Sequence, residues 1–400
     1  MNRYLNLLVF YLFLLSISIY PERLQYKYLK GEKYRIIHEV DEYININGIP
    51  TNRTKIMNKI AVHTINTKSD SGELDCIYQT SENFLGNKSS FQLKEDYQSK
   101  FWRDRLGLYT IDDKYFMPVI RNIPLFPDKD INIGETWTSD AYEVHDMKKQ
   151  FGLEQPLRIP IKVHYKYLNN LTIDSKKIAV LKVSYTIFYK TPYKQLNLMP
   201  IPVLISGYSE QVYYWNIEEG RLDSHKEEFD YYFTLSNRSS IEYIGNSKGT
   251  YYLSPALDKE KIAQDLNKEL KEKGITDTSV KTDEKGVTLS LENIQFQANS
   301  FQLSESEKEK LKKIAELIQK VPDRDVFITG HTARVGYEET SQILSKKRSK
   351  AVGDFLISLK ILKNRQILTV GKGSTVPIGD NNTEEGRRQN RRVEITILEN

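Results

Sequence analysis

One arginine near the C-terminal end of the chain, Arg348, stands at a position where its side chain could do chemistry. It follows Leu344 by four positions and precedes Val352 by four, so the periodicity places it between the buried and exposed sides of a helix. A guanidinium at such a border can bind a carboxylate through two parallel hydrogen bonds. Taken alone, the same residue is more simply a solvated side chain of a basic helix, because arginines are mostly exposed.

The chemistry of metals is not indicated. His331 lies in the segment before this helix, and the other histidines are scattered singly, without the paired spacing of metal ligands. The one cysteine, Cys76, excludes a multi-cysteine zinc site and an intramolecular disulfide. We therefore predict no metal site and interpret His331 as a hydrogen-bonding residue that stabilises its loop.

Catalytic patterns are missing as well. The sequence contains no G-x-S-x-G, no P-loop and no G-x-G-x-x-G. The 53 acidic residues are numerous enough for carboxylate pairs to arise by chance. The sequence accordingly predicts a protein that is not an enzyme, with no catalytic residues and no cofactor.

The charge balance argues against nucleic acid. The chain has 58 basic and 53 acidic residues, a net charge of +5, and so no strong field that would attract a polyanion. A local cluster comprises Arg387, Arg388, Arg391 and Arg392. We interpret these arginines as solvated or loop-pinning, and we predict no nucleic-acid partner.

The N-terminus has the layout of a secretory signal peptide. Within residues 1–18, Arg3 precedes an apolar run over 5–15, and the small residues Ser16 and Ser18 follow it. An uncleaved anchor is the alternative, but the run is shorter than the ~20 apolar residues that span a bilayer. We expect an exported, periplasmic protein.

The 400 residues predict two or three domains, and residues 20–250 read as β-structure. Apolar Ile161, Val163, Tyr165 and Tyr167 alternate with polar residues, as in a half-buried strand. Similar runs predict an antiparallel sandwich or open barrel of one or two subdomains. A loop leads into Trp137, which is expected to be buried.

Residues 254–400 have a different hydrophobic pattern, which predicts amphipathic helices between short strands. Asp258 is expected to cap a helix over 258–273, and Ser304 with Glu307 forms a capping box for a second. A third helix is expected to bury Leu344, Ala351, Val352 and Phe355. The chain is therefore predicted to be an α+β multidomain protein whose C-terminal part is an α/β sandwich.

Five motifs in this part are linked in order and spacing. They are Ile294-Gln295-Phe296-Gln297-Ala298-Asn299, Gly330-His331-Thr332-Ala333, Leu344-Ser345-Lys346-Lys347-Arg348, Asp380-Asn381-Asn382 and Asn390-Arg391-Arg392-Val393. Together they resemble the OmpA-like, peptidoglycan-associated domain, in a GHTA variant most like spirochaete versions. The resemblance covers roughly the last 110–120 residues and implies a βαβαβ-type domain that binds the stem peptide of bacterial peptidoglycan without altering it.

The resemblance also implies which residues form the site. The family's arginine, which binds the carboxylate of the diamino acid in the stem peptide, falls on Arg348. The polar family residues match Thr332, Asn299 and Ser341, whereas Gln297 stands where an acid is common. The aspartate that binds the ammonium falls on Ala333.

Ala333 departs from the family pattern, because a methyl group cannot pair with an ammonium. Loss of one partner of a desolvated charge pair typically costs about 2–5 kcal/mol. Three explanations remain open: the ligand differs, another acid such as Glu338 or Glu339 supplies the charge, or the domain has lost peptidoglycan binding.

The expected function is that of an envelope anchor. The OmpA-like domain tethers the β-rich domain to peptidoglycan, at the cell wall or the outer membrane. The alternative is an adaptor that no longer binds peptidoglycan and whose β-rich domain binds an envelope protein or a lipid. A wall-modifying enzyme is a weaker third reading.

Overall fold

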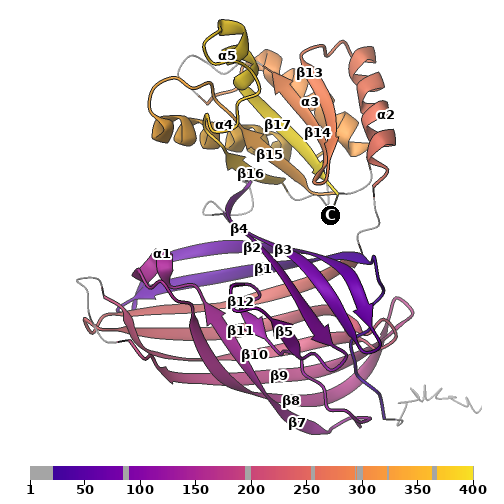
Figure 1. Cartoon of the computed structure of the whole chain (residues 1–400), viewed down its shortest axis with the longest axis vertical. Coiled ribbons are helices and arrows are strands. Elements are labelled where there is room, and N and C mark those ends of the chain that lie inside the picture. The colour runs from indigo at the N-terminus through magenta and orange to yellow at the C-terminus, as the bar shows by residue number, and fades with distance from the viewer. Residues whose placement is uncertain are drawn as a thin grey trace, which may run out of the picture.

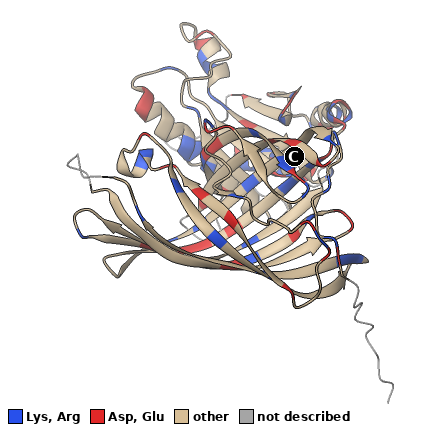
Figure 2. Ribbon diagram, turned by 60° about the horizontal axis from the view of Figure 1, so that its bottom comes forward, with Lys and Arg blue, Asp and Glu red and all other residues tan. Residues whose placement is uncertain are grey.

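The computed structural model describes residues 21–83, 90–193, 200–253, 257–292, 294, 301–321, 324–362 and 367–399. Two parts lie one above the other in Figure 1, a large curved sheet and a smaller part in which helices pack on strands. Basic and acidic side chains are interspersed over both parts (Figure 2). The predicted signal peptide, residues 1–18, lies outside the described residues. Within them, no helix has the length and apolarity needed to cross a membrane.

The N-terminal part is strand-rich and forms one large antiparallel sheet. Its order is β6-β7-β8-β9-β10-β11-β12-β1-β2-β3-β4-β5. The strands are β1 (Lys33–Ile46), β2 (Ile49–Lys68), β3 (Ser71–Asn83), β4 (Phe91–Asp104), β5 (Tyr109–Ile111), β6 (Ile120–Arg121), β7 (Thr136–His145), β8 (Leu157–Ile173), β9 (Lys176–Lys190), β10 (Pro202–Asn216), β11 (Arg221–Leu235) and β12 (Ser240–Leu253). A single helical turn, α1 (Lys148–Phe151), follows β7.

Alternation along the strands produces the core of this sheet. In β8, every second side chain from Leu157 to Tyr167 is buried and the residues between them are exposed, as the sequence pattern predicts. The fully buried tryptophan of this core is Trp215. The expectation for Trp137 was wrong in degree. Its ring is only partly buried at the margin of the core, where it stacks on Tyr165 and its Nε1–H donates to the Leu125 carbonyl over 2.9 Å.

The C-terminal part has a five-stranded sheet in the order β13-β14-β17-β15-β16, of which only the β15–β16 pair is parallel. Its elements are α2 (Lys259–Glu272), β13 (Thr278–Asp283), β14 (Gly286–Glu292), α3 (Glu305–Gln319), β15 (Val326–Gly330), α4 (Glu338–Ser358), β16 (Ile367–Gly371), α5 (Glu384–Asn390) and β17 (Arg392–Leu398). Helices and sheet share one apolar core.

Side-chain caps set the starts of three helices. The Asp258 carboxylate accepts from the Lys261 N–H at α2, and the Ser304 hydroxyl accepts from the Glu307 N–H at α3. Thr383 caps α5 in the same way. These caps satisfy backbone donors that have no partner within the helix.

The two parts contact each other directly. The first residues of β4, Phe91 and Gln92, pair in parallel with Leu368 and Thr369 of β16, so one strand bridges both sheets (Figure 1). Just before them, the Ser90 N–H and hydroxyl donate to Asp354 of α4 over 2.7 and 2.9 Å. A small apolar cluster fills the junction: Ile37, Met57, Leu368 and Leu398, with Phe91 and Phe327 at its margin.

A buried group of charges lies in the same junction. The Lys59 ammonium lies 3.2 Å from the Asp325 carboxylate, and the Arg35 guanidinium lies 3.3 Å from it. The Lys59 and Asp325 side chains are 2% and 3% exposed. Burial lowers the pKa of Lys59, and Asp325 opposes that shift. The junction therefore contains an ion pair removed from water.

Candidate ligand-binding site

The loop after β15 carries two of the predicted site residues, Thr332 and Ala333, and both are buried. Backbone hydrogen bonds fix the loop. The His331 N–H donates to the Arg392 carbonyl, and the Thr332 N–H donates to the Gly373 carbonyl, each over 2.9 Å. Within the described part of the chain, the buried Thr332 hydroxyl has no hydrogen-bond partner. This hydroxyl is itself buried, so a ligand reaches it only if the loop shifts.

The helix α4 packs on the sheet through small residues, contrary to the expectation from its apolar periodicity. Its buried side includes Ser341, Ser345 and Ser349 as well as Val352, whereas the expected core residues Leu344, Ala351 and Phe355 are only partly buried. Small side chains are needed because the helix backbone approaches glycines at the strand ends. A Cβ on Gly330 would lie 2.3 Å from the Ser345 carbonyl oxygen, and Gly371 is equally confined.

This packing positions Arg348. It lies seven residues after the buried Ser341, hence on nearly the same side of α4 and about 10 Å further along its axis. Arg348 is partly buried. Burial lowers its pKa, and the nearby Arg391 lowers it further, although arginine stays protonated in proteins. Arg391 adds positive charge beside Arg348, although Glu384 is ion-paired with Arg391 and offsets part of it.

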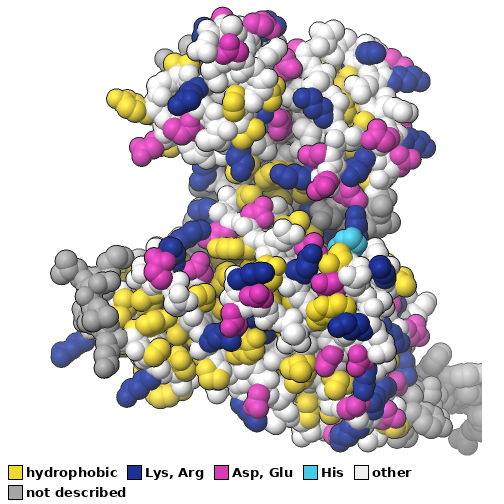
Figure 3. Space-filling view, viewed as in Figure 1, with side chains coloured by type: hydrophobic (Ala, Val, Ile, Leu, Met, Phe, Trp, Pro, Cys, Tyr) yellow, Lys and Arg dark blue, Asp and Glu magenta, His cyan; other side chains and the backbone are white. Residues whose placement is uncertain are grey.

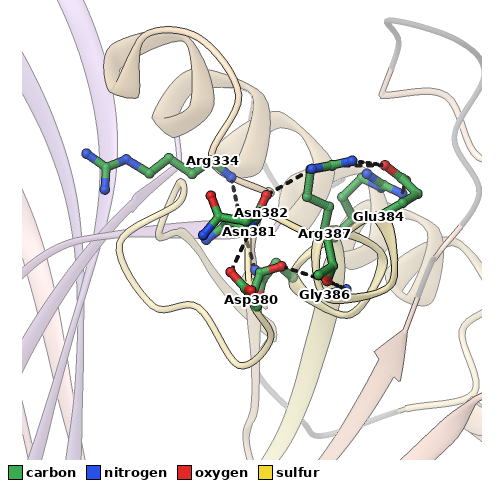
Figure 4. A network of polar contacts seen from close by, with 10 residues as sticks. Arg334, Asp380, Asn381, Asn382, Glu384, Gly386 and Arg387 are labelled. Atoms are coloured by element: carbon green, nitrogen blue, oxygen red, sulfur yellow. Dashed lines mark hydrogen bonds and ion pairs between the residues drawn. The ribbon is translucent and has the colours of Figure 1, made fainter.

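A second loop is tied to the first by a polar network (Figure 4). The Arg334 N–H donates to Asn381 Oδ1 over 2.9 Å, and the buried Asn390 donates to the same oxygen over 3.0 Å. Arg387 Nη1 donates to the Asn381 carbonyl, and both Arg387 and Arg391 donate to Glu384. Arg387 thus holds the loop, which is one of the two roles that the sequence left open for these arginines. The sequence did not reveal Asn381 as the link, because its Asp-Asn-Asn run signals only a turn.

His331 belongs to a buried polar group under the loop. Its Nε2 lies 3.4 Å from a Glu394 carboxylate oxygen, and the buried Arg392 donates to the other oxygen over 2.8 Å. Burial alone would raise the pKa of Glu394, but His331 and Arg392 outweigh it and lower the pKa to about 2. Within the described residues, neither ring nitrogen of His331 has a hydrogen-bond partner, so only its backbone N–H donates in the loop and the ring contributes through its proximity to Glu394.

The sequence offered two glutamates in place of an aspartate at position 333, and the described contacts engage one of them elsewhere. The Glu338 carboxylate accepts from the Ser374 N–H over 3.1 Å and from the Ser374 hydroxyl, which commits it to the loop after β16. Glu339 is an exposed residue in the first turn of α4. Asn299 and Gln297, two other positions that the sequence singled out, lie outside the described residues.

Comparison with known protein families matches residues 295–391 to the OmpA family. Residues 295–391 are an OmpA family domain. The peptidoglycan-binding protein ArfA of Mycobacterium tuberculosis is 38% identical over 104 residues, which cover 26% of this chain and 32% of ArfA. Outer membrane porin F of Pseudomonas aeruginosa is 31% identical over 105 residues, which cover 26% of this chain and 30% of the porin. This chain thus spans less than a third of the length of these relatives.

A solved structure of an outer membrane protein from Borrelia burgdorferi B31 is 40% identical to the matching part. It covers 30% of this chain and 96% of that protein, with a TM-score of 0.26. Relatives of the OmpA domain thus include proteins named for peptidoglycan binding and for the outer membrane.

Proposed function

We propose that the OmpA domain binds a peptidoglycan stem peptide through a carboxylate and so anchors the β-rich domain to the cell wall. The observation that carries this proposal is the partly buried Arg348, whose positive potential is reinforced by Arg391. Arg348 binds the carboxylate, and the Thr332 hydroxyl and Ser341 supply polar contacts. The mature protein, without residues 1–18, is exported and carries out no reaction.

A second function is favoured by one specific observation. Position 333 is a buried alanine, and the carboxylate of Glu338 is already bound to Ser374. A ligand ammonium at this place lacks a counter-ion, which weakens binding by about 2–5 kcal/mol. In this alternative, the OmpA domain has lost peptidoglycan binding and the protein is an adaptor whose β-rich domain binds an envelope protein or a lipid.

Co-sedimentation with purified, insoluble peptidoglycan tests the anchor. The whole mature chain is used, because a C-terminal fragment would lose the β4–β16 pairing. We expect the wild-type protein to pellet and Arg348→Ala to stay in solution. Arg388→Ala is the matched control, since it removes the same charge from an exposed position beside Glu385. Equal pelleting of wild type and Arg348→Ala contradicts the assigned role of Arg348.

The variant Ala333→Asp separates the two functions. If the wild type pellets weakly and Ala333→Asp pellets about 30-fold more tightly or better, the site is an anchor that lacks one counter-ion. If the wild type stays in solution and only Ala333→Asp pellets, the pocket persists but the adaptor function is correct. If neither pellets, the anchor proposal fails.

A further inference from the structure

The β-rich domain contains a cavity of about 430 Å³ on the face of the sheet that points away from the OmpA domain. Strands β1 and β2 separate this cavity from the OmpA domain. Arg35, Ile37 and Lys59 contact the OmpA domain or its junction, whereas their neighbours His38 and Asn58 line the cavity. Because successive side chains of a strand point to opposite faces, the cavity and the junction lie on opposite sides of the same two strands. Its volume is within the range typical of small-molecule sites, roughly 300–1,000 Å³.

One wall of the cavity carries a chain of hydrogen bonds centred on Glu227. The Ser247 hydroxyl donates to Glu227 Oε2 over 2.8 Å, and the Ser209 hydroxyl donates to Glu227 Oε1 over 2.7 Å. Ser247 Oγ is also 2.8 Å from His38 Nε2. Burial lowers the pKa of His38 although Glu227 opposes the shift, so this ring is not a strong cation near neutral pH. The carboxylate of Glu227 is held in place by neutral donors.

A second acid, Glu143, faces the cavity from β7. Gln150 of α1 lines the cavity on the same side. Glu143 is 2% exposed, and its Oε1 accepts from the Tyr185 hydroxyl over 2.7 Å. The Tyr231 hydroxyl is 2.9 Å from that of Tyr185, and His145 Nε2 lies 2.7 Å from Glu143 Oε2. Both Glu143 and Glu227 raise the pKa values of Tyr185 and Tyr231, in addition to the effect of burial. The two carboxylates therefore both influence the same pair of tyrosine hydroxyls.

The remainder of the lining is apolar or acidic. Phe229, Phe233 and Met147 contribute apolar surface, and Glu42 and Asp146 add two more acids. Burial and the neighbouring Glu82 raise the pKa of Glu42 to about 7. Among the described residues that line the cavity, none is a lysine or an arginine. Hydrophobic side chains are also gathered on the outer surface of this domain below α1 (Figure 3).

We propose that this cavity binds a small amphipathic ligand whose apolar body carries a positively charged amine. The apolar body contacts Phe229 and Phe233, and the amine lies between Glu143 and Glu227. An amine supplies the positive charge that the lining lacks, and a desolvated charge pair of this kind contributes strongly to selectivity. A ligand with a carboxylate or phosphate in the same place would meet four acids and no basic side chain other than histidine. The site is separate from Arg348 and does not rest on the anchor function.

Two fluorescent probes test this proposal on the whole mature chain. One is a dansyl group with a pentylamine tail, and the other is the same dansyl group with a hexanoic acid tail. Dansyl emission increases on entry into an apolar cavity, so titration gives both affinities. We expect the amine to bind at least about tenfold more tightly than the acid at neutral pH. Equal affinities, a preference for the acid, or no binding of either probe would overturn the proposal.

Variants assign the binding to the cavity. Glu227→Gln and Glu143→Gln keep the shape of the side chain and remove its charge, and each should weaken amine binding about tenfold or more. Glu228→Gln is the matched control, because Glu228 is exposed on the opposite face of β11. Unchanged affinity in both cavity variants, or equal weakening by Glu228→Gln, contradicts the site. If both cavity variants fail to fold, the probe preference of the wild type still decides the outcome.

Discussion

Asp325 offers the sharpest test of how the two parts of the molecule are held together. Asp325→Asn keeps the side-chain shape and removes the negative charge beside Lys59 and Arg35. Two unit charges 3.2 Å apart interact by about 5 kcal/mol at an effective dielectric constant of about 20. Breaking a buried ion pair typically costs about 3–5 kcal/mol. We therefore expect Asp325→Asn to lower the free energy of unfolding by about 3–5 kcal/mol at neutral pH.

The assay exploits the placement of the chromophores. The three tryptophans, Trp102, Trp137 and Trp215, all lie in the β-rich domain, whereas the helices longer than one turn all lie in the described C-terminal part. In urea, tryptophan fluorescence thus reports on one domain and far-UV circular dichroism at 222 nm mainly on the other. The two transitions should coincide in the wild type and separate in Asp325→Asn, because the junction couples the domains.

The control and the pH dependence make the reasoning refutable. Asp140→Asn removes an exposed acid that lies 3.0 Å from Lys162, and it should cost less than about 1 kcal/mol. Burial already lowers the pKa of Lys59, and loss of Asp325 lowers it further. The unfolded chain then holds the lysine proton to higher pH than the folded chain, so the variant should regain stability as pH rises toward about 10. A loss no larger than that of Asp140→Asn would refute the argument.

Three further predictions concern the OmpA domain. The pKa of Glu394 is about 2 in the folded chain, below its value in the unfolded chain. Glu394 therefore adds about 2–3 kcal/mol to the free energy of unfolding above pH ~4.5, and this contribution is lost as the pH falls toward 2. Acid unfolding of the variant Glu394→Gln should lack this pH dependence. Gly371→Ala places a Cβ 2.4 Å from the backbone nitrogen of Lys346, and we expect it to lower the free energy of unfolding by about 1–3 kcal/mol, measured by thermal unfolding. Asn390→Ala leaves the Ile378 and Gly379 N–H groups without their acceptor and should cost about 1–3 kcal/mol, whereas an unchanged melting temperature would show that water replaces it.

Local rules predicted much of the fold. The alternation of β8 and the caps Asp258 and Ser304 follow from interactions within a few residues, which a sequence displays directly. The buried side of α4 was predicted only in part. Val352 is buried as expected, but Ser341, Ser345 and Ser349 are buried as well by the close approach of glycines on β15 and β16. Periodicity of apolar residues cannot detect a face that is buried because it is small.

The candidate site could be predicted from the sequence, whereas the acidic lining of the cavity could not. Arg348 was identified from a linear motif, and its partial burial agrees with the predicted position at the helix border. An apolar cleft in the β-rich domain was only a minority interpretation of its aromatic residues, and the acids of the cavity were not predicted, since Glu143 and Glu227 lie 84 positions apart and come together only in the folded sheet. The pairing of β4 with β16 was likewise hidden, because Phe91 and Gln92 resemble the start of any strand.

The short pairing of Phe91 and Gln92 with β16 also has a consequence for contacts between copies of the protein. An edge strand left open offers its backbone N–H and C=O groups to any extended chain, and such edges promote aggregation. Here β4 occupies the outer edge of β16, and the apolar cluster with Leu368 and Leu398 lies beneath it. We therefore expect the β-rich domain to protect this edge of the OmpA domain from self-association. In sedimentation velocity, we expect the isolated fragment 254–400 to form dimers or larger species at concentrations where the whole chain stays monomeric.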